Sequence, residues 1–144
     1  MKKYFVIAVL ALVAVFAVSC NKNKKVDIVG HTWTCHENVD TLDAHISMDL
    51  SLAFINADSV DATTSIVAPG RNETQTVRRS YTWDGEKNLV IYRTNEDNTI
   101  LTRNLTYVKE TEEFHMPLDQ IEGDNTAQMI ELMGIDELVF KKVK

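Results

Sequence analysis

The chain has 144 residues and a formal net charge of −6, and 25% of its residues are charged. This length is typical of one domain with one hydrophobic core. The excess of acidic residues argues against nucleic acid and anionic headgroups as partners, because a negative surface repels both.

The first twenty residues have the layout of an export signal. Lys2 and Lys3 form a positively charged start, residues 4–18 are almost entirely apolar, and small residues precede Cys20. The tetrapeptide Ala17-Val18-Ser19-Cys20 resembles the bacterial lipobox, which implies cleavage before Cys20 and diacylation and N-acylation of that cysteine. A plain transmembrane anchor is the alternative, but the apolar run is slightly shorter than the roughly 18–20 residues that cross a bilayer.

This signal predicts three parts of the chain. Residues 1–19 are the lipoprotein signal peptide, 20–25 a lipidated polar tether, and 26–144 the folded domain, held to the membrane by lipid. Cys35 is then the one thiol left besides the lipidated cysteine, so a disulfide framework is excluded. A buried, inert thiol is favoured for Cys35 over an intermolecular or redox role.

Alternation of apolar and polar residues predicts strands through the first half of the domain. A first strand at 30–36 places His31, Trp33 and Cys35 on one face. Turn residues at 56–59 and a weaker alternation at 59–67 predict a hairpin with the preceding strand. That preceding strand, at 45–55, gives the strongest signal, with large apolar residues at every second position: Ile46, Met48, Leu50, Leu52 and Phe54.

The second half continues in the same way. Residues 74–83 carry Val77, Tyr81 and Trp83 on one face, and Asp84-Gly85 predicts a tight turn into a strand at 88–94. Further strands are expected at 99–109, 113–118 and 137–143. One short helix is expected at 126–133, capped by Asp124 or Asn125 and ended by Gly134.

Eight strands follow one another without a crossover of helical length, so an antiparallel arrangement is expected. Closing the sheet on itself removes the exposed edges of a flat sheet. The sequence therefore predicts an all-β, eight-stranded antiparallel up-and-down barrel with one short helix before the last strand. A two-sheet sandwich is the alternative that the same alternation permits.

Gly30 and Trp33 at the head of this strand series, together with Phe140-Lys141-Lys142 at its end, resemble small lipocalin-like lipoproteins of Bacteroidetes. Lipocalins carry Gly-x-Trp, whereas this chain has one residue more between the glycine and the tryptophan. The resemblance implies that a basic residue of the last strand, here Lys142, lies over Trp33 in a cation–π contact.

The same resemblance has implications for location and modification. Surface-exported lipoproteins of that group carry acids soon after the lipidated cysteine. Residues 21–25 have none, which implies an outer-membrane protein that faces the periplasm. That group also O-glycosylates Asp-Ser/Thr followed by an aliphatic residue, so Thr41 and Ser59 are candidate glycosylation sites.

The histidines and the second cysteine do not predict a metal centre or an active site. Alternation sends His36 to the opposite face from His31 and Cys35, and none of the usual metal-binding or nucleophile motifs occurs. We therefore expect a protein that is not an enzyme and has neither a metal nor a cofactor.

Arg79, Arg93 and Arg103 each share a predicted strand face with large apolar residues. Because burial of a lone guanidinium is costly, positions at strand ends or pointing outward are favoured; inward placement would imply a buried acid or an acidic ligand. Arg79 and Arg103, with Trp33 and Trp83, are the candidate ligand-binding residues.

Two functions from different classes remain open. The lipocalin-like pattern implies that the barrel binds a small apolar or amphiphilic molecule. The alternative is a non-catalytic structural or assembly module of an outer-membrane complex, because an eight-stranded barrel can equally be filled by its own side chains.

Overall fold

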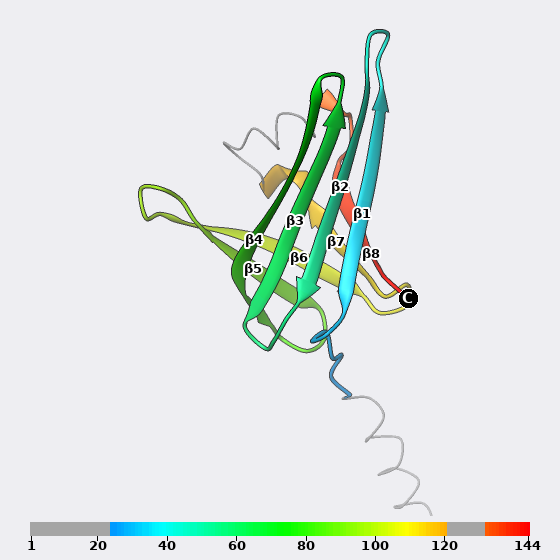
Figure 1. Cartoon of the computed structure of the whole chain (residues 1–144). Coiled ribbons are helices and arrows are strands. Elements are labelled where there is room, and N and C mark those ends of the chain that lie inside the picture. Colours follow the sequence, from blue (N-terminus) through cyan, green and yellow to red (C-terminus); the bar gives the residue numbers. More distant parts are fainter. Residues whose placement is uncertain (1–23, 121–131) are drawn as a thin grey trace, which may run out of the picture.

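The computed structural model describes residues 24–120 and 132–144 (Figure 1). The signal peptide, Cys20 and most of the expected helix at 126–133 lie outside these ranges. Eight strands and a 3₁₀ turn follow one another: β1 (Thr32–Asp40), β2 (His45–Phe54), β3 (Ser59–Ala68), β4 (Arg71–Trp83), β5 (Asn88–Thr94), β6 (Ile100–Val108), β7 (Glu113–Pro117), η1 (Leu118–Gln120) and β8 (Glu137–Lys142).

The strands form a closed antiparallel barrel in sequence order, which confirms the predicted fold class. Closure is made where β8 pairs with β1, at Trp33 opposite Lys142 and Thr34 opposite Lys141. This pairing rules out the alternative of two separate sheets. Within the described ranges, no helix has the length and apolar character needed to cross a membrane.

Some strands are longer than the sequence predicts. β1 continues to Asp40 because it pairs with β2 along its whole length, and β4 begins at Arg71 because its pairing with β3 reaches the last position, Ala68 opposite Arg71. The turn between β3 and β4 is therefore tight, with Gly70 at a φ of 74°. The interval between the predicted strands, residues 68–73, was too wide, since cross-strand pairing overrides the low β-propensity of Asn72 and Glu73.

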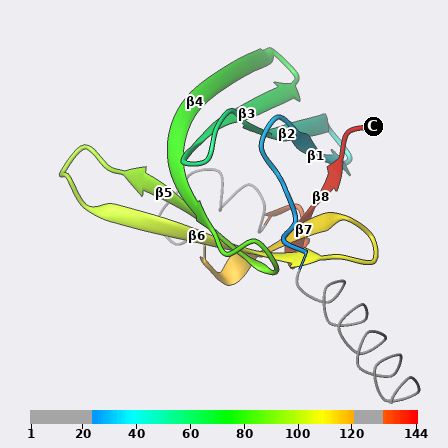
Figure 2. The ribbon, with the colours of Figure 1, turned by 90° about the horizontal axis from the view of Figure 1, so that it is seen from below.

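Alternate turns lie at opposite ends of the barrel, which we name the base and the rim. The base comprises the chain at 24–31, the turns at 55–58, 84–87 and 109–112, and the end of the chain at 141–144. The rim comprises the turns at 41–44, 69–70 and 95–99, with the strand ends beside them and the described chain between β7 and β8. Viewed from the base, the chain before β1 crosses the end of the barrel (Figure 2).

The crossing segment closes the base. The backbone N–H of Val26 donates to the carbonyl of Gly85 at 2.7 Å, and that of Gly30 donates to the carbonyl of Phe54 at 2.8 Å. Between them, Ile28 is only 1% exposed and belongs to the core. The base end of the barrel is thus filled by backbone and by an apolar side chain from outside the strands.

An aromatic layer lies directly above this closure. Phe114 is its centre, with ring centroids 5.1 Å from Trp33, 5.6 Å from Trp83 and 5.0 Å from Tyr107. The indole N–H groups are both satisfied by backbone: Trp33 donates to the carbonyl of Glu112 at 2.8 Å and Trp83 to that of Val26 at 2.9 Å. Buried polar atoms of tryptophan need such partners, and here they also tie the base loops to the core.

The predicted contact between the last strand and Trp33 is confirmed. The Nζ atom of Lys142 lies 5.8 Å from the centroid of the indole ring, within the range of a cation–π contact. The same ammonium group donates to Glu112 at 3.1 Å. Lys142 therefore links β8, β1 and the turn before β7 at the point where the barrel closes.

Candidate functional site

Above the aromatic layer the barrel interior contains a cavity of about 190 Å³. Its lining is mainly apolar and comes from seven of the eight strands. The apolar lining residues are Leu50, Leu52, Ala62, Ile91, Leu105, Met116, Leu138 and Phe140.

The cavity exists because one wall carries small side chains. In the register between β2 and β3, Ala62 lies opposite Leu52 and Thr64 lies opposite Leu50. Both small residues occupy inward positions of β3, where a barrel without a cavity needs large side chains. Nearer the base the same strand carries Val60, which is fully buried, so the interior is filled there and hollow above it.

Three arginines line the cavity from adjacent strands. Arg79 belongs to β4, Arg93 to β5 and Arg103 to β6. The register places Arg103 opposite Ile91, and Arg93 opposite Leu101. All three side chains are half-buried. The cavity therefore combines an apolar lining with a cationic wall.

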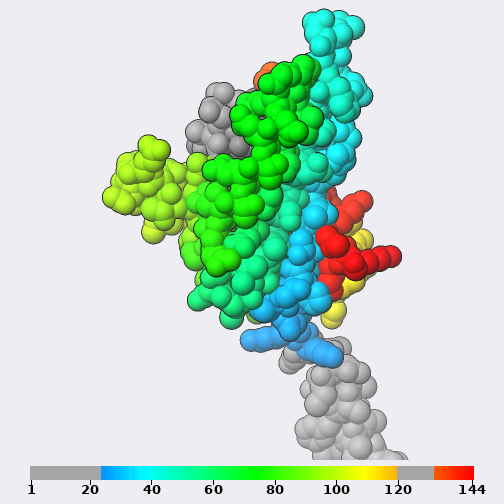
Figure 3. All heavy atoms as spheres, viewed as in Figure 1, coloured from blue at the N-terminus to red at the C-terminus, as the bar shows by residue number. Residues whose placement is uncertain are grey.

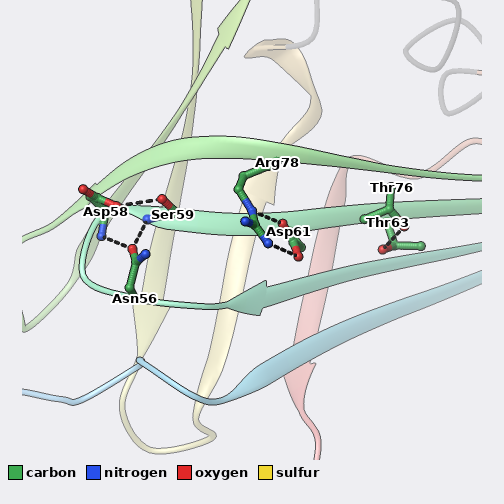
Figure 4. Close-up of polar contacts among 7 residues, drawn as sticks. All are labelled: Asn56, Asp58, Ser59, Asp61, Thr63, Thr76 and Arg78. Carbon is green, nitrogen blue, oxygen red and sulfur yellow. Dashed lines mark hydrogen bonds and ion pairs between the residues drawn. The ribbon is translucent and has the colours of Figure 1, made fainter.

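The neighbouring Arg78 shows that alternation places successive arginines on opposite faces of the sheet. Arg78 faces the outer surface, where its guanidinium donates to both carboxylate oxygens of Asp61, at 2.7 and 3.0 Å (Figure 4). This hydrogen bonding holds the pKa of Asp61 below its usual value. Because successive residues of a strand point to opposite faces, Arg79 is directed to the interior.

The preference for outward or strand-end positions was wrong for Arg79 and Arg103, whereas Arg93 does lie near a strand end. Arg79 and Arg103 lie within their strands and face the cavity, and Arg93 does so one residue before the end of β5. The cost of burial is reduced because each side chain is only half-buried and keeps part of its surface in contact with solvent. Arg103 also donates to the carbonyl of Thr102 at 3.3 Å.

The candidate ligand-binding residues separate into two groups. Arg79 and Arg103 are brought together at the cavity, whereas Trp33 and Trp83 are not among its lining residues. Both tryptophans pack against Phe114 in the aromatic layer. Ile91, Leu138 and Phe140 also line the cavity and were not predicted to do so, although each has the inward alternation that identifies lining positions.

Cys35 is buried, as expected, and is 3% exposed on the inner face of β1. Burial, together with the nearby carboxylate of Glu37, raises the pKa of the thiol to about 11. The Sγ atom lies 3.9 Å from an oxygen of Glu37. A thiol with so high a pKa carries almost no thiolate at neutral pH, so its nucleophilicity is low.

The histidines near the start of the domain are distributed over the outer surface. His36 pairs with Asp49 and His45 pairs with Asp40, on exposed positions of β1 and β2. Among the described residues, no group of three or more histidine, cysteine or acidic side chains is placed to hold a metal ion.

The two candidate glycosylation sites differ in accessibility. Thr41 is exposed in the turn between β1 and β2, and its hydroxyl is bonded to the backbone of Ala44. Ser59 is half-buried at the start of β3, where its hydroxyl donates to Asp58 at 2.6 Å (Figure 4).

Comparison with known proteins identifies no relative of this chain. A scan against protein-family models, a search of curated proteins and a search of solved structures each found no match. The residues that line the cavity therefore indicate the kind of ligand that it suits. Guanidinium groups beside apolar carbon suit a molecule that has an anionic group and a short apolar part.

Proposed function

We propose that the barrel binds a small amphiphilic molecule in its cavity. The apolar part of the ligand contacts the leucines and Phe140, and its anionic group contacts Arg79, Arg93 and Arg103. The observation that carries this proposal is the presence of three arginines on adjacent strands of a mainly apolar cavity, whose other polar lining residues are Ser51, Thr63 and Thr64.

The volume of the cavity limits the ligand. Pockets for drug-sized ligands measure about 300–1,000 Å³, whereas an apolar cavity of about 150 Å³ accommodates benzene. A volume of about 190 Å³ therefore suits one small ring or a short chain. A longer molecule would leave most of its length outside the barrel.

The choice of arginine favours an oxyanion. A guanidinium presents N–H groups in a planar fork that matches a carboxylate or phosphate, and it stays charged at every physiological pH. In a half-buried site such charge-assisted hydrogen bonds are stronger than in water. A neutral hydrocarbon would gain nothing from these groups, so an amphiphile is preferred to a purely apolar ligand.

Native mass spectrometry and solvent extraction of the protein from its own host test this proposal. We expect a co-purifying anionic amphiphile, and we expect Arg79→Ala and Arg103→Ala to lose it. Arg78→Ala is the matched control, because Arg78 lies next in sequence but faces outward. Loss of the ligand in all three variants, or in none, would contradict an arginine-lined site.

An empty barrel that instead co-purifies with another envelope protein would favour the alternative assembly role. The same preparations answer this question, because native mass spectrometry detects both kinds of partner. In that case the arginine variants test only whether the barrel remains folded.

We further propose that the protein is anchored by lipid on Cys20 at the periplasmic side of the outer membrane. The lipobox-like tetrapeptide and the lack of acids at 21–25 support this location. Three acyl chains, at about 0.8 kcal/mol per buried methylene, give effectively permanent anchoring. Fractionation should find the protein in the membrane, and Cys20→Ala should release it; digestion by protease added to intact cells would contradict a periplasmic location.

A further inference from the structure

The two ends of the barrel differ in the kinds of charged residue that they carry. Every lysine of the described residues lies at the base: Lys24, Lys25, Lys87, Lys109, and the group Lys141, Lys142 and Lys144. They come from four separate stretches of the chain, so the clustering is a product of the fold and not of sequence proximity.

The rim has the opposite character. Acidic residues occupy its turns and the strand ends beside them, among them Asp40, Asp43, Glu73, Glu96 and Asp97. Arg71 lies at the same end and is paired with Glu73 at 2.7 Å. Among the described residues, the excess of acidic over basic residues is thus concentrated away from the base.

Exposed apolar side chains accompany the lysines. Val29, Ile55 and Val143 are 39%, 46% and 50% exposed. Val29 belongs to the segment that crosses the base, Ile55 follows β2, and Val143 follows β8, where its N–H donates to the carbonyl of Thr32. Apolar side chains framed by lysines are typical of a surface that lies on lipid headgroups.

We propose that the base of the barrel docks on an anionic phospholipid bilayer, with the lysines at the headgroups and the three apolar side chains at their boundary with the acyl chains. This inference rests on the proposed lipid anchor, because the anchor joins the chain at the same end. It differs from the expectation based on net charge alone, since the charge that faces the bilayer is that of one end only.

Only a weak attraction between the base and the bilayer is required for docking. Six acids also lie at the base, Asp27, Asp58, Asp84, Glu86, Glu110 and Glu112, so the base is close to neutral and the rim is strongly acidic. An anchored protein is already confined to the membrane surface, which raises its effective concentration there. The orientation of the barrel on the membrane then depends on the difference in charge between the two ends. Repulsion between the bilayer and the acidic rim favours the same orientation as attraction between the bilayer and the lysines.

The length of the tether supports this orientation. Residues 20–24 reach at most about 17 Å when fully extended. Strand β2 has 10 residues, and strands of this length, tilted as in a barrel, span about 25 Å between the ends. The rim therefore cannot turn to face the bilayer that holds the anchor.

The exposed apolar residues of the rim do not form a competing surface. Leu42, Ile100, Leu132 and Val67 are 105%, 67%, 84% and 44% exposed. They lie on four separate segments, namely the β1–β2 turn, the start of β6, the chain before β8 and the end of β3, and the tips of the β1–β2 and β5–β6 hairpins point apart (Figure 3). Leu42 is near Asp40 and Asp43 in the sequence, and Ile100 is near Glu96 and Asp97. An anionic bilayer would repel both tips.

This orientation fixes the side from which a ligand arrives. The cavity lies on the rim side of the aromatic layer, and the base is closed by Ile28 and the segment around it. A ligand from the anchoring bilayer has no direct path through the base. Exchange therefore takes place with the aqueous phase or with a partner that approaches the rim.

Lipid-phase quenching of a fluorophore tests the proposal. The lipidated protein is reconstituted in vesicles of phosphatidylethanolamine and phosphatidylglycerol that contain brominated lipids, with a single label on Ile55→Cys or on Leu42→Cys. Native Cys35 is buried and stays unlabelled. We expect several-fold stronger quenching at position 55 than at position 42, and weaker quenching at 55 when phosphatidylcholine replaces the anionic lipid.

Charge variants separate docking from anchoring. Lys87→Gln with Lys109→Gln should reduce the quenching at position 55, whereas Arg71→Gln at the rim should leave it unchanged. Equal quenching at both positions, or stronger quenching at 42, would overturn the docking proposal while vesicle association persists. Failure of the chain to associate with vesicles would instead contradict the lipid anchor, and neither result affects the arginine-lined cavity.

Discussion

The two halves of the barrel interior follow the same alternation of inward and outward residues but are filled differently. Towards the base, Trp33, Phe54 and Phe114 are at most 1% exposed and contact one another edge to face or tilted. Towards the rim, Ala62 and Arg79 occupy equivalent inward positions and are only half-buried. Alternation therefore determines where a side chain points, whereas the volume of the side chains determines whether the space is filled.

This difference assigns separate roles to the two halves. Removal of any atom from a close-packed aromatic layer removes packing contacts. We therefore expect this layer to contribute most to the stability of the domain. The half that contains the cavity, which is lined by small residues and arginines, has fewer packing contacts but has space for a ligand. Substitutions in the two halves should then have different consequences, which four predictions express.

The largest effect is expected at the centre of the aromatic layer. Phe114→Ala should lower the free energy of unfolding by about 3–5 kcal/mol, because it leaves a cavity among four aromatic rings. Leu50→Ala, in the half-buried wall of the existing cavity, should cost clearly less. Chemical denaturation of both variants measures this difference, and similar losses would contradict a division into filled and hollow halves.

A second comparison concerns the turns of the two ends. Gly85 at the base and Gly70 at the rim have φ values of 87° and 74°, so alanine at either position should cost about 1–2 kcal/mol. At Gly85 an added Cβ would also lie 2.8 Å from Lys25, whereas at Gly70 nothing lies within 4 Å. Gly85→Ala should therefore be the more destabilising in thermal unfolding, because the side chain of Lys25, in the segment that closes the base, must also shift.

Filling the cavity should affect binding more than stability. Ala62→Leu places additional methylenes in the hollow half, and we expect the free energy of unfolding to rise by about 0.5–1 kcal/mol or to stay unchanged. Ligand occupancy in native mass spectrometry should fall at the same time. A strong loss of stability would show instead that this region is already closely packed.

The smallest effect is expected in the pH dependence of the base. The Asp84 carboxylate accepts hydrogen bonds from the backbone N–H groups of Lys87, Glu86 and Asn88, which hold its pKa at about 2 instead of 3.8. Because the folded pKa is the lower one, this contribution is complete above about pH 4 and is lost as the pH falls towards 2. Asp84→Ala should flatten that part of the stability–pH profile, and the change should be modest because the group is exposed.

Much of the fold could be predicted from the sequence because strands with one buried face leave a local pattern. The alternation from Ile46 to Phe54 needed no tertiary information, and Asp84-Gly85 identified its turn through the positive φ that glycine permits. The exact bounds of β5, 88–94, followed from such signals on both sides. β1 and β4 were underestimated because their ends are held by partner strands rather than by their own residues.

The candidate site was only partly accessible to the same reasoning. Alternation placed Arg79 and Arg103 on the faces of apolar residues, but the cost of burying a charge favoured the outward alternative. That cost depends on how much water remains around the guanidinium, which is a property of the assembled interior. The tryptophans were conspicuous in the sequence, yet their neighbours place them in the packed layer.

The sequence by itself determined the number of strands, their antiparallel direction and the faces of the large apolar residues within them, because these follow from periods of two residues and from turn chemistry. It did not determine the faces of the arginines or of His31, which is exposed and precedes β1. Only the tertiary structure decided that a cavity remains, that three arginines from β4, β5 and β6 converge on it, and that the lysines gather at one end. These features depend on which strands become neighbours when the barrel closes. Closure brings together residues more than 100 positions apart in the sequence, such as Trp33 and Lys142, and no local pattern contains that information.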